Sequence, residues 1–354
     1  MKEKYLTGRW ELSCLVINLI LYKIFTNVPE SFMEAGSSAF MATVISALIS
    51  YAVIWFLPCI YKKAGAKNIF ELLEKNRLAT VFCGLIILTW LILSSAQALE
   101  SLVSFSKIAA FPSAPFVFIA CFFLLAAAAA VLKGMEAAVR PHALIVPFCI
   151  FMILFMLSSV VKYFDLTNLL PVFGKGVKET LYTSVKNLPC FFDFVLVFLI
   201  NPFIKNEESL CRTVRISGAV GIAVVLLIML SANLIISYPV SEQIEFPVFQ
   251  IMKNVYFGRF FQRIDAVYLL SAVLSGMAYL SFTVFLMTYT FKKTFRTENN
   301  RPFVWNFLLI IMLLALLIYK KHAMLYIPLT FFGVSAVILL ISVPLILPEG
   351  RAKK

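Results

Sequence analysis

Near its amino terminus the chain reads Leu12-Ser-Cys-Leu-Val-Ile-Asn-Leu-Ile-Leu-Tyr-Lys-Ile-Phe-Thr-Asn-Val28. This stretch can cross a bilayer, since a membrane-spanning helix needs roughly 20 mostly apolar residues. Its one ionisable side chain, Lys23, lies near the expected midplane and shortly before Pro29. An ammonium group at that depth is costly unless it is paired or faces a water-filled cavity. Lys23 either reaches the membrane surface from a helix end or carries a fixed charge in a solute-binding cavity where the first helix breaks. We favour the cavity.

The composition is that of a membrane protein. Hydrophobic residues make up 62% of the 354 positions, and charged residues make up only 14%. A soluble domain of this composition would expose large apolar patches to water. The first apolar stretch is not followed by a small-residue cleavage pattern, so we do not expect it to be a signal peptide. The sequence predicts an all-α polytopic membrane protein with a single integral membrane domain over residues 1–354.

Apolar runs separated by short polar stretches predict about ten membrane helices. Their expected ranges are 9–28, 36–60, 79–107, 115–133, 143–161, 176–204, 213–238, 262–291, 303–320 and 323–347. Basic residues are unequally shared between the two sides, roughly 20 against roughly 10, and the richer side is expected to be cytoplasmic. We therefore predict an even number of helices with both termini in the cytoplasm. The lipid bilayer is the expected surrounding partner.

The sequence contains little that suggests catalysis or metal binding. Its seven cysteines stand singly, without a Cys-x-x-Cys pair, and it has only two histidines. We expect no disulfide framework, metal site or cofactor, and no enzyme activity. No polar stretch has the basic and aromatic pattern of a nucleic-acid surface, so we expect no nucleic-acid partner.

A second break is predicted in the sixth helix. Transporters built from inverted repeats bind their solute where two corresponding helices are interrupted, and five plus five helices would make helix 6 the counterpart of helix 1. Pro189 removes a backbone donor there and disfavours helix at the preceding residue. Asp193 places a carboxylate in the same apolar run, where it could face the solute, cap the second half-helix, or do both. The predicted solute-binding residues at the two breaks are Lys23, Ile24, Thr26, Asn27, Cys190, Phe191, Phe192 and Asp193.

Two other helices carry candidate polar groups. Ser94, Ser95 and Gln97 lie in the third helix, where Gln97 shares a face with Glu100 that we expect to point into a polar interior. The serines could equally be close-packing residues. In the eighth helix, Ser271 and Ser275 share a face at i and i+4. Their hydroxyls are candidate ligands for a solute or a cation.

Five short motifs carry a resemblance to a known family. They are Phe111-Pro-Ser-Ala-Pro115, Lys133-Gly-Met-Glu-Ala-Ala-Val-Arg140, Leu169-Leu-Pro-Val-Phe-Gly-Lys-Gly176, Pro189-Cys-Phe-Phe-Asp193 and Phe261-Gln-Arg-Ile-Asp265. In their order and spacing, the chain resembles the endospore germination permeases, which are the B-type subunits of spore germinant receptors in the amino acid–polyamine–organocation superfamily. The resemblance covers nearly the whole chain.

The resemblance implies a LeuT-like fold. Ten helices would form a five-plus-five inverted repeat, with helices 1 and 6 discontinuous and the two repeats at about 9–162 and 175–347. Lys23 and Phe192 stand where the superfamily has glycine, which predicts less exposed backbone and a smaller cavity.

The implied function is that of a nutrient-sensing membrane subunit of a germinant receptor in the cell or spore inner membrane. It would bind a small-molecule germinant, such as an amino acid, at the helix 1/6 break and trigger germination together with A-type and C-type subunits. Two alternatives stay open. One is a proton-coupled amino acid transporter, and the other is an ion-conducting or structural subunit with a degenerate site. Sensor and transporter share one fold, so the sequence does not separate them.

Overall fold

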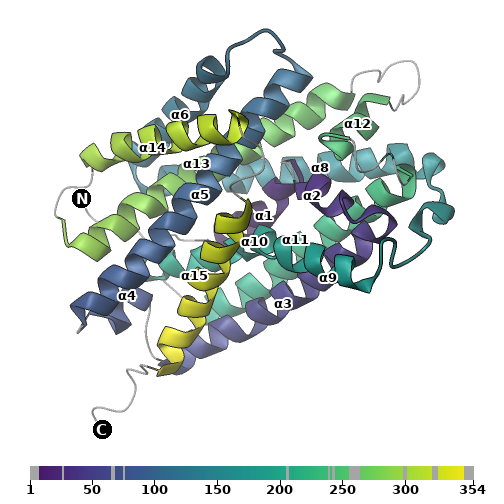
Figure 1. Ribbon diagram of the computed structural model, residues 1–354. Helices are drawn as coiled ribbons and strands as arrows, with labels where there is room; N and C mark the ends of the chain where they lie inside the picture. Colours follow the sequence, from purple (N-terminus) through teal and green to yellow (C-terminus); the bar gives the residue numbers. More distant parts are fainter. Residues whose placement is uncertain are drawn as a thin grey trace.

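Helices make up nearly all of the described chain and pack side by side in one bundle (Figure 1). The computed structural model describes residues 8–25, 28–64, 68–74, 76–204, 207–237, 240, 244–254, 264–297, 301–320 and 326–346. The α-helices are α1 (Arg9–Leu21), α2 (Val28–Met33), α3 (Ala39–Ala64), α4 (Ile69–Leu72), α5 (Arg77–Ala109), α6 (Phe116–Lys133), α7 (Met135–Val139), α8 (His142–Val160), α9 (Val177–Lys186), α10 (Pro189–Phe192), α11 (Glu207–Ile235), α12 (Pro247–Asn254), α13 (Ile264–Phe295), α14 (Arg301–Lys320) and α15 (Tyr326–Ile346). The 3₁₀-helices are η1 (Tyr22–Phe25), η2 (Gly36–Ser38), η3 (Val161–Tyr163), η4 (Leu166–Leu169) and η5 (Asp193–Phe203).

The predicted membrane helices are present. Within the described residues, nine segments are long and apolar enough to cross a membrane. They coincide with nine of the ten predicted ranges. The tenth, predicted at 9–28, is divided, because α1 ends at Leu21 and the chain continues as η1. The all-α polytopic fold class is therefore confirmed.

The first helix breaks at the lysine that marked it in the sequence. After the 13 residues of α1, the backbone tightens into η1, which carries Lys23, and it resumes α-helical form in α2. Residues 26 and 27 lie outside the described part of the chain. A tight 3₁₀ stretch inside a longer helix is typical of a hinge or of a strained functional segment.

The sixth helix breaks in the same manner. The amphipathic α9 ends at Lys186, Pro189 begins the four-residue α10, and Asp193 begins η5. The proline suits the first turn, where its missing N–H would have no helical partner. At 11 residues, η5 is far longer than 3₁₀-helices usually are. At each of the two breaks, therefore, regular α-helix gives way to 3₁₀-helical backbone, η1 in the first helix and η5 in the sixth.

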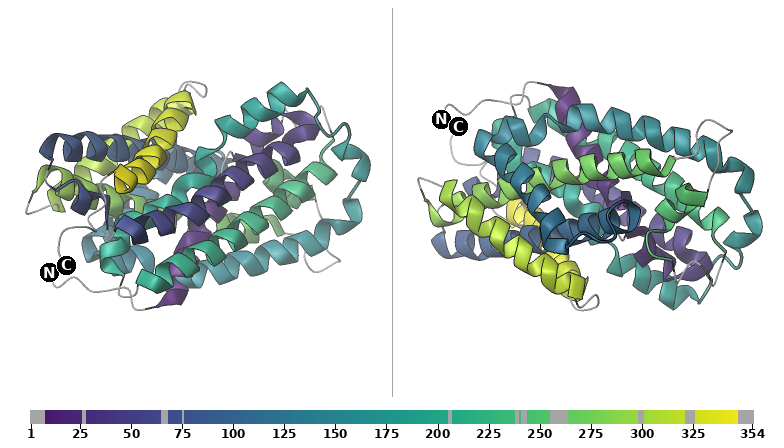
Figure 2. Two further views of the ribbon diagram at one scale, coloured as in Figure 1. Left: turned by 90° about the horizontal axis from the view of Figure 1, so that it is seen from below. Right: turned by 90° about the horizontal axis from the view of Figure 1, so that it is seen from above.

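The broken helices lie inside the bundle. The side chains of α1 from Cys14 to Leu21 are all buried, and Figure 2 shows α1 (dark purple) crossing the interior between the other helices. It packs mainly against α11 and α8, and η5 also contacts it. The two breaks thus face each other away from the lipid-facing surface.

The most extensive packing between two helices of the described chain is that of α5 against α13. Two glycines allow this close approach. A Cβ atom built on Gly84 would lie 2.0 Å from Thr294 Oγ1, and one built on Gly276 would lie 2.5 Å from Leu102 Cδ2. Small residues are the usual means by which membrane helices approach closely. α13 also contacts α1, η1 and η5, so the α5–α13 pair positions one wall of the site.

Candidate functional site

The two breaks are joined by a buried ion pair. Lys23 Nζ lies 3.0 Å from Asp193 Oδ2, with side-chain exposures of 8% and 1%. Lys23 therefore turns inward rather than toward the membrane surface. The contact is direct, although the sequence required only that the two charges share a site. A buried ion pair is stable only where further hydrogen bonds satisfy its charged atoms.

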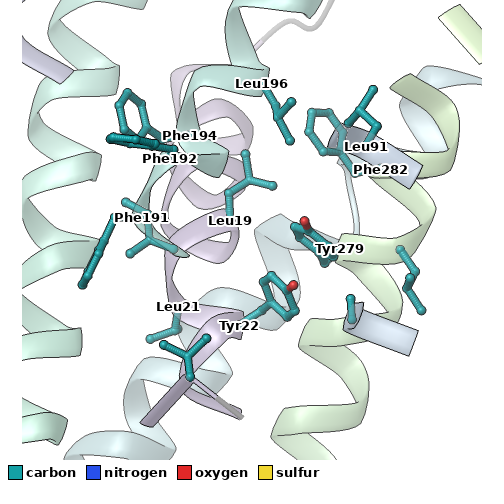
Figure 3. Close-up of a cluster of buried hydrophobic side chains, with 14 of the residues drawn as sticks. Leu19, Leu21, Tyr22, Leu91, Phe191, Phe192, Phe194, Leu196, Tyr279 and Phe282 are labelled. Carbon is teal, nitrogen blue, oxygen red and sulfur yellow. The ribbon is translucent and has the colours of Figure 1, made fainter. Parts of the chain in front are cut away.

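Tyr279 of α13 completes the surroundings of the carboxylate. Its hydroxyl donates to Asp193 Oδ2 at 2.8 Å and lies 2.5 Å from Ser94 Oγ of α5. The ring of Tyr279 stacks on that of Tyr22, with centroids 3.7 Å apart and an interplanar angle of 21°. Both rings appear among the buried side chains of Figure 3. Residues from four elements, η1, η5, α5 and α13, are thereby held in one network.

One face of α13 carries this network from turn to turn. Ser275 donates to Asn18 Oδ1 at 2.7 Å, and Asn18 Nδ2 donates back to the Ser275 carbonyl at 3.2 Å. Four residues further on is Tyr279, and four beyond that is Thr283, which accepts a hydrogen bond of 2.8 Å from Ser95 of α5. Residues four apart are neighbours on a helix surface. α13 is therefore fastened to α1 and α5 on either side of the ion pair.

Side chains also satisfy backbone groups that the breaks set free. The hydroxyl of Tyr268 donates to the Ile24 carbonyl at 3.4 Å, and Asn68 Nδ2 donates to the Leu199 carbonyl of η5 at 2.9 Å. Irregular backbone at membrane depth persists only where such partners are available. Packing of other parts of the chain against η1 and η5 therefore stabilises the irregular backbone at both breaks.

Next to the ion pair is a small cavity of about 10 Å³, which is about the room that one water molecule needs. Its lining includes Lys23, Ile24, Cys190 and Phe191 from the two breaks. Four of the predicted site residues therefore surround one space. In this conformation that space is too small for an amino acid.

The remaining predicted residues differ in their placement. Ser275 and Ser94 lie in the network. Ser271 is buried but donates to the Val267 carbonyl of its own helix, on the border of a second apolar cavity. Phe192 is buried in the hydrophobic core, and Gln97 is half-buried on α5 outside the contacts described above. Thr26 and Asn27 lie outside the described residues.

At Ser275, one of the two serines predicted as candidate cation ligands, the side-chain amide of Asn18 takes up the oxygen atoms that a cation would need. The hydroxyl and the carbonyl oxygen of Ser275 both bond to the Asn18 amide. Within the described part of the chain, no group of three His, Cys, Asp or Glu side chains could hold a metal ion. Glu100 is 1% exposed and accepts a hydrogen bond of 2.7 Å from Ser104, so it faces the protein interior as expected.

Sequence reasoning missed four residues of the network, Tyr22, Tyr279, Thr283 and Asn18, of which Thr283 continues the four-residue spacing of Ser271 and Ser275. Tyr22 adjoins Lys23, but a tyrosine in an apolar run gives no signal by itself. Tyr279 was detectable, since it continues the four-residue spacing of Ser271 and Ser275. Asn18 was detectable as the one amide within an otherwise apolar part of the first helix.

Two solved structures show the same fold. A mutant of the manganese transporter of Eremococcus coleocola matches with a TM-score of 0.62 at 11% identity, over 94% of this chain and 76% of that chain. A Na⁺-coupled sialic acid symporter, solved in a substrate-bound, outward-open state, matches with a TM-score of 0.65 at 10% identity, over 95% of this chain and 78% of that chain. Both are transporters rather than enzymes, and at these identities the likeness shows the fold alone. It confirms the LeuT-like prediction.

Comparison of sequences identifies the family, which the likeness to solved structures does not. Spore germination protein B2 of Bacillus subtilis (strain 168) is 27% identical over 205 residues, which are 55% of this chain and 53% of that protein. The aligned part thus spans about half the length of this relative. The family model described as "Spore germination protein" matches residues 10–324, nearly the whole chain. The chain therefore belongs to the spore germination protein family of membrane permeases.

Proposed function

We propose that this chain is the nutrient-sensing membrane subunit of a spore germinant receptor. A small solute, such as an amino acid, binds at the break shared by helices 1 and 6 and triggers germination. The observation that supports this most is the buried contact between Lys23 and Asp193, which joins the two breaks. Ionisable groups at membrane depth are expensive, and they mark functional sites.

The geometry suggests how binding becomes a signal. A solute that carries an ammonium and a carboxylate offers one partner to Asp193 and another to Lys23. Since the adjoining cavity holds about 10 Å³, such a solute fits only after η1 and η5 separate. A ligand shifts a conformational equilibrium by its difference in affinity for the two states. Solute binding therefore favours the separated state, and the segments joined to η1 and η5 transmit the change.

Family membership supports the remaining parts of the proposal. The protein partners are A-type and C-type receptor subunits, and the location is the inner membrane of the cell or spore. Both termini lie in the cytoplasm, which the asymmetry of basic residues supports. The matching breaks of helices 1 and 6 support two repeats, at about 9–162 and 175–347.

Transport is the second candidate function, and the fold likeness to two transporters favours it. The two functions differ in one measurable quantity. A transporter accumulates a labelled amino acid in vesicles that contain the purified protein, and a sensor binds the amino acid without accumulating it. Accumulation above that of vesicles that contain the same protein but have been made permeable to the amino acid, where only binding retains label, would establish transport.

Replacing Lys23 by arginine should weaken the solute response without abolishing it. Arginine keeps the charge, but its planar guanidinium does not reproduce the compact ammonium beside the stacked rings of Tyr22 and Tyr279. We expect the half-maximal concentration for germination by a panel of L-amino acids to rise about tenfold, or about 1.4 kcal/mol. The matched control is Lys107→Arg, because Lys107 also contacts a tyrosine, at 3.1 Å from Tyr319 Oη, outside the breaks. Equal responses of Lys23→Arg and wild type, at equal protein levels, would speak against the site.

A further inference from the structure

The carboxylate of Asp193 has unused binding capacity. It is fully buried, and its Oδ2 atom receives both Lys23 Nζ and the Tyr279 hydroxyl. Its Oδ1 atom has no hydrogen-bond donor among the described residues. A buried carboxylate oxygen without a donor is costly, so the site is built to accept at least one more N–H or O–H group.

Two stacked tyrosine rings border the ammonium group of Lys23. Lys23 Nζ lies 5.1 Å from the ring centroid of Tyr22 and 5.6 Å from that of Tyr279. Since the two rings stack with their centroids 3.7 Å apart, a nitrogen at these distances lies beside the stack rather than over a ring face, so the rings border the ammonium group and shield it from water. The carboxylate and the two rings come from η5, η1 and α13. The carboxylate supplies the negative charge, the Tyr279 hydroxyl holds it in place and the stacked rings close one side, which is the chemistry of a site for a primary ammonium group.

We propose that Asp193, Tyr22 and Tyr279 form a binding site for a primary ammonium group, and that the chain's own Lys23 occupies this site until an external ammonium displaces it. The proposal deepens the proposed function, on which its biological meaning rests. The ammonium of the solute is the group that competes with Lys23, and the free Oδ1 atom is where it first gains a contact. Displaced from Asp193, Lys23 becomes available to the carboxylate of the solute.

The test removes the internal ligand and supplies an external one. Lys23→Ala deletes every side-chain atom beyond Cβ, and propylammonium has about the length of the deleted part. Purified full-length Lys23→Ala, titrated with propylammonium chloride, should show a saturable rise in melting temperature of about 2 °C or more. Wild type should respond only at much higher concentrations, because Lys23 already fills the site.

Three controls make the titration specific. Sodium chloride and tetramethylammonium chloride at equal ionic strength should not reproduce the rise, since neither offers an N–H donor. The double variant Lys23→Ala/Asp193→Asn should lose it, because the carboxylate is gone. The absence of a rise in Lys23→Ala, or an equal rise in the double variant or with tetramethylammonium, would overturn the proposal.

The experiment remains informative if Lys23→Ala does not fold in the absence of an external ammonium compound. If Lys23→Ala is recovered folded only when propylammonium is present during solubilisation, that result supports the site. If it is recovered under neither condition while the double variant folds, the proposal is wrong. A failed titration leaves the sensing function standing, whereas an unchanged germination response of Lys23→Arg beside a successful titration removes the sensing function and keeps the ammonium site.

Discussion

Lys23→Met and Asp193→Asn are each expected to destabilise the protein by about 3–5 kcal/mol, and the double variant Lys23→Met/Asp193→Asn by much less. Each single substitution leaves one charge buried without its partner. The double variant removes both charges, so only the contacts of two neutral side chains with their surroundings are changed. Because Asp193 is fully buried and Lys23 is 7% exposed, bulk water does not reach the remaining charge, and the adjoining cavity has room for only about one water molecule.

Thermal or denaturant unfolding of the purified variants in one detergent measures these differences. Lys107→Met is the control, since it removes a lysine that contacts Tyr319 but joins no helix break. Two charges that depend on each other give strong coupling in the double-mutant cycle. Additive effects of Lys23→Met and Asp193→Asn would show that the two charges do not depend on each other.

Gly84→Ala should also be strongly destabilising, by about 1–3 kcal/mol. The added methyl group would lie 2.0 Å from Thr294 Oγ1 and 2.7 Å from its Cγ2, so α5 and α13 would have to move apart. The same helix pair carries Ser94 and Tyr279, whose hydroxyls are 2.5 Å apart. We therefore expect both the melting temperature and the solute response to fall.

Two comparisons test the cause. In Gly84→Ala/Thr294→Ala the nearest two atoms are gone, and part of the stability should return. Gly218→Ala should have a smaller effect than Gly84→Ala, since its new methyl group meets the flexible end of the Ile54 side chain at 2.9 Å. If Gly218→Ala is as destabilising as Gly84→Ala, close packing of α5 on α13 is not the reason.

The helices and both breaks could be predicted because each has a local cause. Long apolar runs predicted the spans, and Pro189 predicted where the sixth helix is interrupted. Lys23 and Asp193 could be singled out because a charged side chain at membrane depth is energetically costly unless it is paired or has a function. These signals are contained in single segments of the chain, so no knowledge of the packing was required.

The network around the ion pair depends on packing between distant segments. Tyr279 lies 86 residues from the carboxylate that it binds, and Asn18 lies 257 residues from Ser275. Whether a serine on α13 faces a solute, a cation or an amide is decided by the neighbouring helix. That is why Ser275 was found as a polar residue of the site, and its Asn18 partner was not.

The most direct test of the account is the germination response of spores that carry Lys23→Met/Asp193→Asn. The response to a panel of L-amino acids is measured at equal protein levels beside wild type and Lys107→Met. We predict a normal response for Lys107→Met, and for the double variant either none or a half-maximal concentration raised at least about a hundredfold. A dose–response of the double variant equal to that of wild type would contradict the claim that the pair joining the two breaks recognises the solute.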